Sequence, residues 1–254
     1  MKSNKHLILA ENYSYSILLG DLQEPSEHKH LSMHLTTSLT GGLKANINGK
    51  TVKSEKTLII ASNEKHYIEI KEQEPIMVVN LSPASNIGLY LKGLLKKQPY
   101  IQLTSSGISQ ALKETGLKLY LGKVNQKQFT EQIEGIFESI ITEPTQTNNN
   151  VYDERIVKAI LFIFENSTKT LPAEIVASHV CLSVGRFLHL FKQETDITYR
   201  RMQIWIKLVQ SFWQFPRANS LTELAHNCGF ADSAHFCREF KQTFGTSPAG
   251  IFKK

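Results

Sequence analysis

The sequence predicts an α+β protein of two domains, in which a β-rich part and a helical pair precede a separate all-helical part. Two features predict this: apolar residues alternate over residues 1–85, and they recur at helical spacing over residues 86–142 and again over residues 151–254. Between the last two segments, EPTQTNNN at 143–150 has no apolar residue and predicts an exposed linker. The expected domains are therefore residues 1–142 and 151–254.

The β-rich part contains four runs that alternate as strands do, with turn residues between them. They are HLSMHLTTSL (30–39), KANING (44–49), KTLIIAS (56–62) and PIMVVNLS (75–82). Short strands at this spacing favour a sandwich or a barrel. Three segments then carry apolar residues at i, i+3, i+4 and i+7, as amphipathic helices do: 86–97, 106–120 and 125–141.

The composition excludes several protein classes. With 41% hydrophobic and 20% charged residues, the 254-residue chain is typical of a soluble globular protein. No apolar run approaches the ~20 residues that a membrane helix needs, so no membrane partner is expected. Three cysteines make no even framework and no CxxC pair, which argues against a disulfide scaffold and favours the cytoplasm.

The positive charge lies mainly in the C-terminal domain. The net charge is +6, and residues 151–254 hold thirteen basic and nine acidic side chains, including all six arginines. Arginine suits bidentate contacts with phosphate and guanine, so an anionic partner is one interpretation. A mildly basic, solvated surface is the other.

The C-terminal domain contains a weak internal repeat at an offset of 49 residues. EIVASHVCLSVGRFLHLFKQ, from Glu174, aligns with ELAHNCGFADSAHFCREFKQ, from Glu223. Each copy divides into a short helix, a tight turn and a second helix that begins after a capping residue, Ser183 or Asp232. This is the layout of a helix-turn-helix unit, whose second helix enters the major groove of DNA.

The same residues resemble the AraC/XylS family of transcription regulators. LTELAHNCGFADSAHFCREFKQTFGTSP (221–248) is similar to the C-terminal signature of that family, and the segment from Glu174 is similar to its first helix-turn-helix unit. The resemblance covers residues 152–252 and implies two such units joined by a long helix, reading two adjacent major grooves. Residues 198–214 are helical in pattern, and their length of about 25 Å suits that joining helix.

The outward residues of the two recognition helices are the candidate DNA contacts. On each helix, the residues of one face are expected to be buried. They are Phe187, Leu190 and Phe191 on the first, and Phe236 and Phe240 on the second. The remaining positions, several of which match base-contacting positions of the family, are Gly185, Arg186, Leu188, His189, Lys192, Ser233, Ala234, His235, Cys237, Arg238 and Lys241.

Arg238 is the best single base reader among these candidates, because its forked guanidinium can bond twice to a guanine edge. An ion pair with Glu239 or Asp232 is the alternative. Lys192 and Lys241 suit phosphate better than base. Two departures make the first unit the weaker reader: Gly185 offers no side chain, and Asp196 stands where the family usually has a glycine after the recognition helix.

Four histidines form the candidate effector pocket or metal site of the β-rich part. His28, His30 and His34, followed by His66, have a spacing that resembles the metal-binding pattern of cupin barrels, although His34 replaces the usual glutamate. On one continuous strand the first three share a face, and a pocket of imidazoles suits Zn, Fe, Ni or Cu. The alternative is the solvent face of a half-buried strand, since the same row continues with polar residues: Ser32, Thr36 and Ser38. No other cofactor is indicated.

The layout of the N-terminal domain is similar to a cupin-like sensor barrel followed by a dimerising helix pair, at 107–120 and 125–141. The alternative is that these helices pack only on their own barrel. The resemblance therefore implies a homodimeric regulator that binds double-stranded DNA, responds to a small-molecule effector, and acts with RNA polymerase on the bacterial nucleoid.

Two other functions remain open on the sequence alone. One is a metal-dependent cupin enzyme, or a metal sensor, fused to a DNA-binding domain; no GxSxG, P-loop or dinucleotide fingerprint supports an enzyme, and none is expected. The other is a non-specific nucleoid protein, for which a net charge of +4 on the C-terminal domain is modest.

Overall fold

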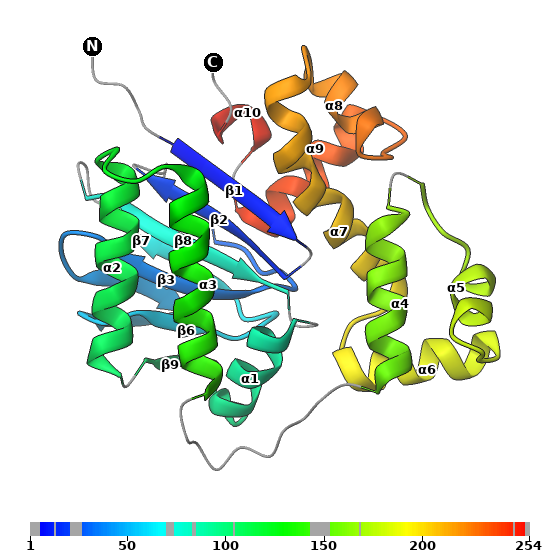
Figure 1. Cartoon of the computed structure of the whole chain (residues 1–254), viewed down its shortest axis with the longest axis horizontal. Helices are drawn as coiled ribbons and strands as arrows, with labels where there is room; N and C mark the ends of the chain where they lie inside the picture. Colours follow the sequence, from blue (N-terminus) through cyan, green and yellow to red (C-terminus); the bar gives the residue numbers. More distant parts are fainter. Residues whose placement is uncertain are drawn as a thin grey trace.

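The chain has a β-sheet domain followed by a helical domain, as the sequence predicts (Figure 1). This computed structural model describes residues 6–12, 14–20, 27–69, 74–82, 85–103, 105–142, 153–167, 169–245 and 247–251. The expected linker at 143–150 lies outside those residues.

The described strands form two antiparallel sheets. They are β1 (His6–Asn12), β2 (Tyr15–Gly20), β3 (Met33–Ser38), β4 (Leu43–Ile47), β5 (Lys50–Ser54), β6 (Leu58–Ile60), β7 (His66–Glu69), β8 (Ile76–Leu81) and β9 (Tyr100–Gln102). The larger sheet has the order β1-β2-β8-β3-β6-β9, and the smaller one β5-β4-β7. A two-residue turn joins β4 to β5, and both its residues, Asn48 and Gly49, have positive φ, which matches the twist of a hairpin.

The strands do not close into a single barrel within the described part of the chain. β7 pairs with β4, and one isolated bridge between His28 and His66 continues the pairing toward the segment that precedes β3. The structure thus gives a two-sheet domain where a cupin-like barrel was expected.

The larger sheet is covered on both faces, so all six residues of β3 are buried. On one face Met33 and Leu35 pack with the helices α2 (Ser106–Tyr120) and α3 (Gln126–Thr142), which cross the sheet side by side (Figure 1). The opposite row, with His34 and Thr36, lies toward the smaller sheet. The apolar stripes of α2 and α3 therefore cover their own domain.

The helical domain is arranged around α7 (Tyr199–Gln214). Before it come α4 (Glu154–Glu165), α5 (Ala173–His179) and α6 (Val184–Thr195); after it come α8 (Leu221–Asn227), α9 (Ser233–Phe244) and α10 (Pro248–Ile251). Figure 1 shows α7 between the two groups. No single described helix is long and apolar enough to cross a membrane. The helices α5 and α6 have the required length and composition only when they are taken as a pair, and a bend of 84° separates them.

In the described part of the chain, the two domains contact each other through β1 and through α1 (Asn86–Leu95), among other contacts. Strand β1 packs against α7. Elsewhere, Lys92 of α1 forms an ion pair with Asp196, the residue that ends α6. The second helix of one helix-turn-helix unit is thereby joined to the sheet domain.

Candidate nucleic-acid interface and histidine cluster

The two expected helix-turn-helix units are α5–α6 and α8–α9. Their second helices begin at the expected caps: Ser183 Oγ accepts a hydrogen bond from Arg186 N (3.3 Å), and Asp232 Oδ1 accepts one from His235 N (2.6 Å). The first helix of each unit presents a fully buried alanine, Ala177 or Ala225, which lets the second helix approach closely. α7 has 16 residues, a length of about 24 Å, and holds the units apart.

The turns of the two units have the same hydrogen bond, but they differ in the number of residues between the turn and the helix cap that follows it. Leu182 N donates to Ala177 O, and Phe230 N donates to Ala225 O, each over 2.9 Å. These bonds are 48 residues apart, whereas the caps are 49 apart, so the second unit has one extra residue between turn and cap. Glu174 and Glu223, which the repeat aligns, are therefore not structurally equivalent.

The first unit uses left-handed backbone at two places where the second has glycine. Cys181 (φ 55°) lies in its turn where Gly229 (φ 73°) lies in the second. Asp196 (φ 59°) ends α6 as Gly245 (φ 71°) ends α9. Aspartate thus adopts the conformation expected at this departure from the family pattern, at an energetic cost that glycine avoids.

The five phenylalanine and leucine residues expected inside are buried. The candidate contacts of α6, which are Gly185, Arg186, Leu188, His189 and Lys192, are exposed. Leu188 is 39% exposed, which leaves an apolar side chain outside, as a contact with a thymine methyl group requires. On α9, Ala234, Arg238 and Lys241 are exposed, and Ser233, His235 and Cys237 are half-buried.

The ion pair of Arg238 with Glu239 or Asp232, which is the alternative to base contact, is not formed among the described residues. Glu239 bonds to Arg201 of α7 (Nη1 to Oε2, 3.0 Å), and Asp232 caps α9. No ion pair involves Arg238 in the part of the chain that the structure describes. His235 is less available than expected, because its ring packs edge-on against Phe230 with centroids 5.4 Å apart.

Lys207 is a positioning residue that sequence reasoning missed. It is 6% exposed, and its Nζ donates to Thr170 Oγ1 (2.7 Å) and to Gly229 O in the turn of the second unit (2.8 Å). Desolvation lowers the pKa of this amine. In the sequence, Lys207 is noticeable only as a lysine between apolar residues of the helix 198–214. A lysine that points into solvent would give the same pattern.

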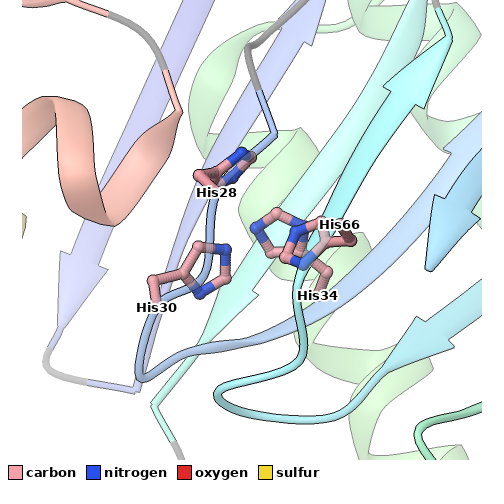
Figure 2. Close-up of side chains that lie close together, drawn as sticks. All are labelled: His28, His30, His34 and His66. Carbon is pink, nitrogen blue, oxygen red and sulfur yellow. The ribbon is translucent and has the colours of Figure 1, made fainter. Parts of the chain in front are cut away.

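The four candidate histidines of the sheet domain converge on one point (Figure 2). Each offers one ring nitrogen, and these atoms all lie within 4.8 Å of one another. His66 Nε2 lies 3.0 Å from His34 Nδ1, and the His30 and His34 ring centroids are 4.2 Å apart. His34 belongs to the larger sheet and His66 to the smaller, so the cluster joins both.

The histidines converge by a different route from the expected one. The strand is not continuous, because the chain bends at Leu31 and Ser32 before β3 begins. The solvent-facing alternative is wrong as well: His30, His34 and His66 are at most 5% exposed, and the polar row with Thr36 is buried. The smaller sheet covers that row, which no pattern within β3 itself reveals.

The buried rings are held neutral. Desolvation lowers the pKa of His30 and of His34 well below the usual value, and the neighbouring imidazoles lower it further. Desolvation, with a contribution from His28, lowers the pKa of His66 to about 4. All three rings therefore present lone pairs at neutral pH.

A cleft of about 810 Å³ lies between the domains. Helix α1 contributes Lys92, the turn after β6 contributes Asn63 and Glu64, and the end of α6 contributes Thr195 and Asp196. The four histidines are not among its lining residues, although Asn63 N donates a hydrogen bond to His30 O (2.7 Å).

The sequence of the helical domain is similar to sequences of known helix-turn-helix proteins. A family model described as a helix-turn-helix domain matches residues 176–254. The transcriptional activator RhaS of Escherichia fergusonii is 31% identical over 100 residues, which are 39% of this chain and 36% of RhaS. The regulatory protein PocR of Salmonella typhimurium is 28% identical over 156 residues, 58% of this chain and 46% of PocR. The chain thus spans less than half the length of these two relatives.

Solved structures extend the likeness to the whole fold. ToxT from Vibrio cholerae aligns over 93% of this chain and 96% of its own, at 10% identity and a TM-score of 0.60. ToxT with an unsaturated fatty acid bound aligns over 98% and 96%, at 12% identity and 0.57. At such identities the likeness is one of fold. In sequence, the helical domain is similar to a helix-turn-helix domain and to part of the transcriptional activator RhaS.

Proposed function

We propose that this protein is a sequence-specific DNA-binding transcription regulator that reads two adjacent major grooves with α6 and α9. The observation that carries the proposal is the matched construction of the two units. Both second helices are capped alike and present one face to solvent, while the opposite face buries two phenylalanines in α6 and three in α9. α7, about 24 Å long, holds the units apart, and the proposal places their second helices in major grooves about 34 Å, one DNA turn, apart.

The candidate contacts divide into two kinds on this proposal. Arg238 reads a guanine edge, and Leu188 packs on a thymine methyl group. Lys192 and Lys241, on the last turns of the two helices, bind phosphate and set the register without reading sequence. His189 adds a polar contact in the first unit, and Gly185 adds none.

We propose further that a ligand of the N-terminal domain controls DNA binding. Three observations support this: a protein of the same fold has been solved with a fatty acid bound, the interdomain cleft adjoins the end of α6, and the buried histidines lie behind that cleft. A ligand at either place contacts the sheet domain next to the first unit.

The remaining partners are those that the resemblance to the AraC/XylS family implies. RNA polymerase and a second copy of the chain are proposed partners, and the nucleoid of the cytoplasm is the proposed location. Since the apolar stripes of α2 and α3 cover their own sheet, dimerisation would use the outer faces of these helices, near the exposed Leu121 and Ile141. Sedimentation with and without charge-introducing variants at these residues tests this.

The test of the function is selection of binding sites from random duplex DNA, followed by affinity measurement at fixed salt. The proposal predicts a selected site bound at least a thousand-fold more tightly than random duplex. Equal affinity for both would contradict it and favour a non-specific nucleoid protein, which the modest net charge of the helical domain argues against.

A further inference from the structure

We propose that His28, His30, His34 and His66 form a binding site for one divalent transition-metal ion, and that its occupancy alters DNA binding by the first helix-turn-helix unit. The second clause rests on the function proposed above, and the first does not. Imidazole-only donors suit borderline ions such as Zn²⁺, Cu²⁺, Ni²⁺ and Co²⁺, and do not suit Mg²⁺ or Ca²⁺, which take oxygen ligands.

The spacing of the four nitrogens suits such an ion. Zn–N bonds of about 2.0–2.1 Å place the nitrogens of a tetrahedral site about 3.4 Å apart. In this protein the four ring nitrogens lie within 4.8 Å of one another, so small side-chain rotations bring them into range. The four imidazoles come from β3, β7 and the segment before β3, so the fold brings them together from three separate parts of the chain.

Partners outside the cluster orient two of the rings. His66 Nδ1 lies 2.8 Å from Glu64 O, and because a carbonyl oxygen only accepts, this nitrogen carries the proton and leaves the Nε2 lone pair facing the cluster. His30 Nδ1 bonds to Ser32 Oγ over 2.8 Å, which leaves its Nε2 toward the other rings in the same way. Metal-bound histidines are held by such bonds to a carbonyl or another polar group.

The interior leaves lone pairs that a metal would use. His30 Nε2 and His34 Nε2 are buried and have no hydrogen-bond partner among the described residues. A buried polar atom without a hydrogen-bond partner destabilises the folded state, so two together are unusual in a stable domain. None of the four clustered side chains is acidic, so no carboxylate explains the cluster as an ion-pair network.

The cluster is connected to the first DNA-binding unit through a short turn. Asn63 N donates to His30 O, and Glu64 O accepts from His66, so residues 62–64 are tied to two of the four ligands. The same turn lines the cleft opposite Thr195 and Asp196, where α6 ends. A metal that draws the rings together therefore acts on the surface that faces the end of a recognition helix.

The binding test uses the full chain after removal of metal by a chelator. Titration with Zn²⁺ against a chromophoric chelator is expected to show one equivalent bound, and Co²⁺ is expected to give the visible absorption of a tetrahedral nitrogen site. His34→Gln and His66→Gln should weaken Zn²⁺ binding at least 100-fold, while His226→Gln, an exposed histidine on α8, should leave it unchanged. Absence of saturable binding, or equal binding by His34→Gln, overturns the site.

Folding of the variants is checked by circular dichroism without metal. If His34→Gln fails to fold, the unaltered protein decides: Zn²⁺ must raise its melting temperature and Co²⁺ must give the nitrogen-ligand spectrum, and failure of either overturns the site. Because these measurements contain no DNA, they stand whether or not the proposed function holds.

The regulatory clause is tested on the selected DNA site. Zn²⁺ should change DNA affinity at least five-fold in the unaltered protein and in His226→Gln, and leave it unchanged in His34→Gln. Stoichiometric Zn²⁺ binding with constant DNA affinity would overturn this clause alone. Failure of the protein to prefer any DNA sequence, both without metal and with Zn²⁺, would instead count against the proposed function.

Discussion

Lys92 and Asp196 form an ion pair between the sheet domain and the end of the first recognition helix. Lys92 lies on α1, and Asp196 holds the left-handed position that terminates α6. The pair lies at the mouth of the interdomain cleft, where both residues line the wall. The ion pair is thus a direct side-chain contact between the two domains.

We predict that this pair couples the two domains weakly and in a salt-dependent way. Both side chains are substantially exposed, 44% and 68%, so the coupling should be about 0.2–1 kcal/mol. A double-mutant cycle of Lys92→Met and Asp196→Asn, read by urea unfolding, measures it. Asparagine preserves the tolerance of the left-handed backbone. A coupling that persists at about 1 M salt, where the Debye length is about 3 Å, would contradict the assignment.

The turns of the two units should respond oppositely to glycine substitutions. Gly229→Ala places a Cβ in left-handed backbone and should lower the free energy of unfolding by about 1–2 kcal/mol. Cys181→Gly relieves the same strain in the first unit and should raise stability by up to about 1 kcal/mol, with Cys181→Ala as the neutral control. Urea midpoints compare all three, and a stabilising Gly229→Ala would refute the equivalence of the turns.

Two helical glycines should likewise differ. At Gly135 of α3 an added Cβ meets nothing within 4 Å, so Gly135→Ala should raise stability by about 0.8–1 kcal/mol. At Gly116 of α2 the same atom would lie 2.7 Å from Leu39 Cδ2 and 3.3 Å from Met77 Sδ, and overpacking offsets the helical gain. We expect the two alanine variants to differ by at least about 1 kcal/mol in urea unfolding. Equal effects would mean that α2 does not pack this closely on the sheet.

Arg238 and Lys241 should differ in the kind of DNA binding that they support. Arg238→Ala should relax specificity at one base position and cost about 1–3 kcal/mol on the selected site. Lys241→Ala should weaken all sequences alike and reduce the slope of log affinity against log salt by about one. Fluorescence anisotropy across a salt series measures both. If Arg238→Ala weakens selected and random DNA equally, its role as a base reader is wrong.

Much of the fold follows from local patterns in the sequence. The segment 106–120 matches α2, and 125–141 matches α3 within one residue at each end, because a repeated apolar spacing is a strong local signal. The caps Ser183 and Asp232 were likewise predictable, since short polar side chains before an apolar run mark helix starts. The three-residue strands β6 and β9 depend on pairing with distant segments, and β9 went unrecognised.

The sequence predicts which residues belong to the candidate sites better than it predicts how those residues are arranged in space. The four histidines were identified by their spacing, but their burial depends on the smaller sheet, which folds over a polar row that reads as a solvent face. The extra residue between turn and cap in the second unit was hidden by the 49-residue repeat. The pairing of Arg201 with Glu239, which leaves Arg238 free of that carboxylate, joins α7 to α9 and has no local signal.

In the proposed function, two helices of one chain read successive major grooves. Methylation interference at guanine N7 on the selected site tests it most directly, because N7 lies in the major groove. We predict two clusters of interfering guanines about one helical turn apart on one face of the duplex, and loss of contacts in only one cluster on Arg238→Ala. A single cluster, or a pattern unaffected by major-groove methylation, would contradict it.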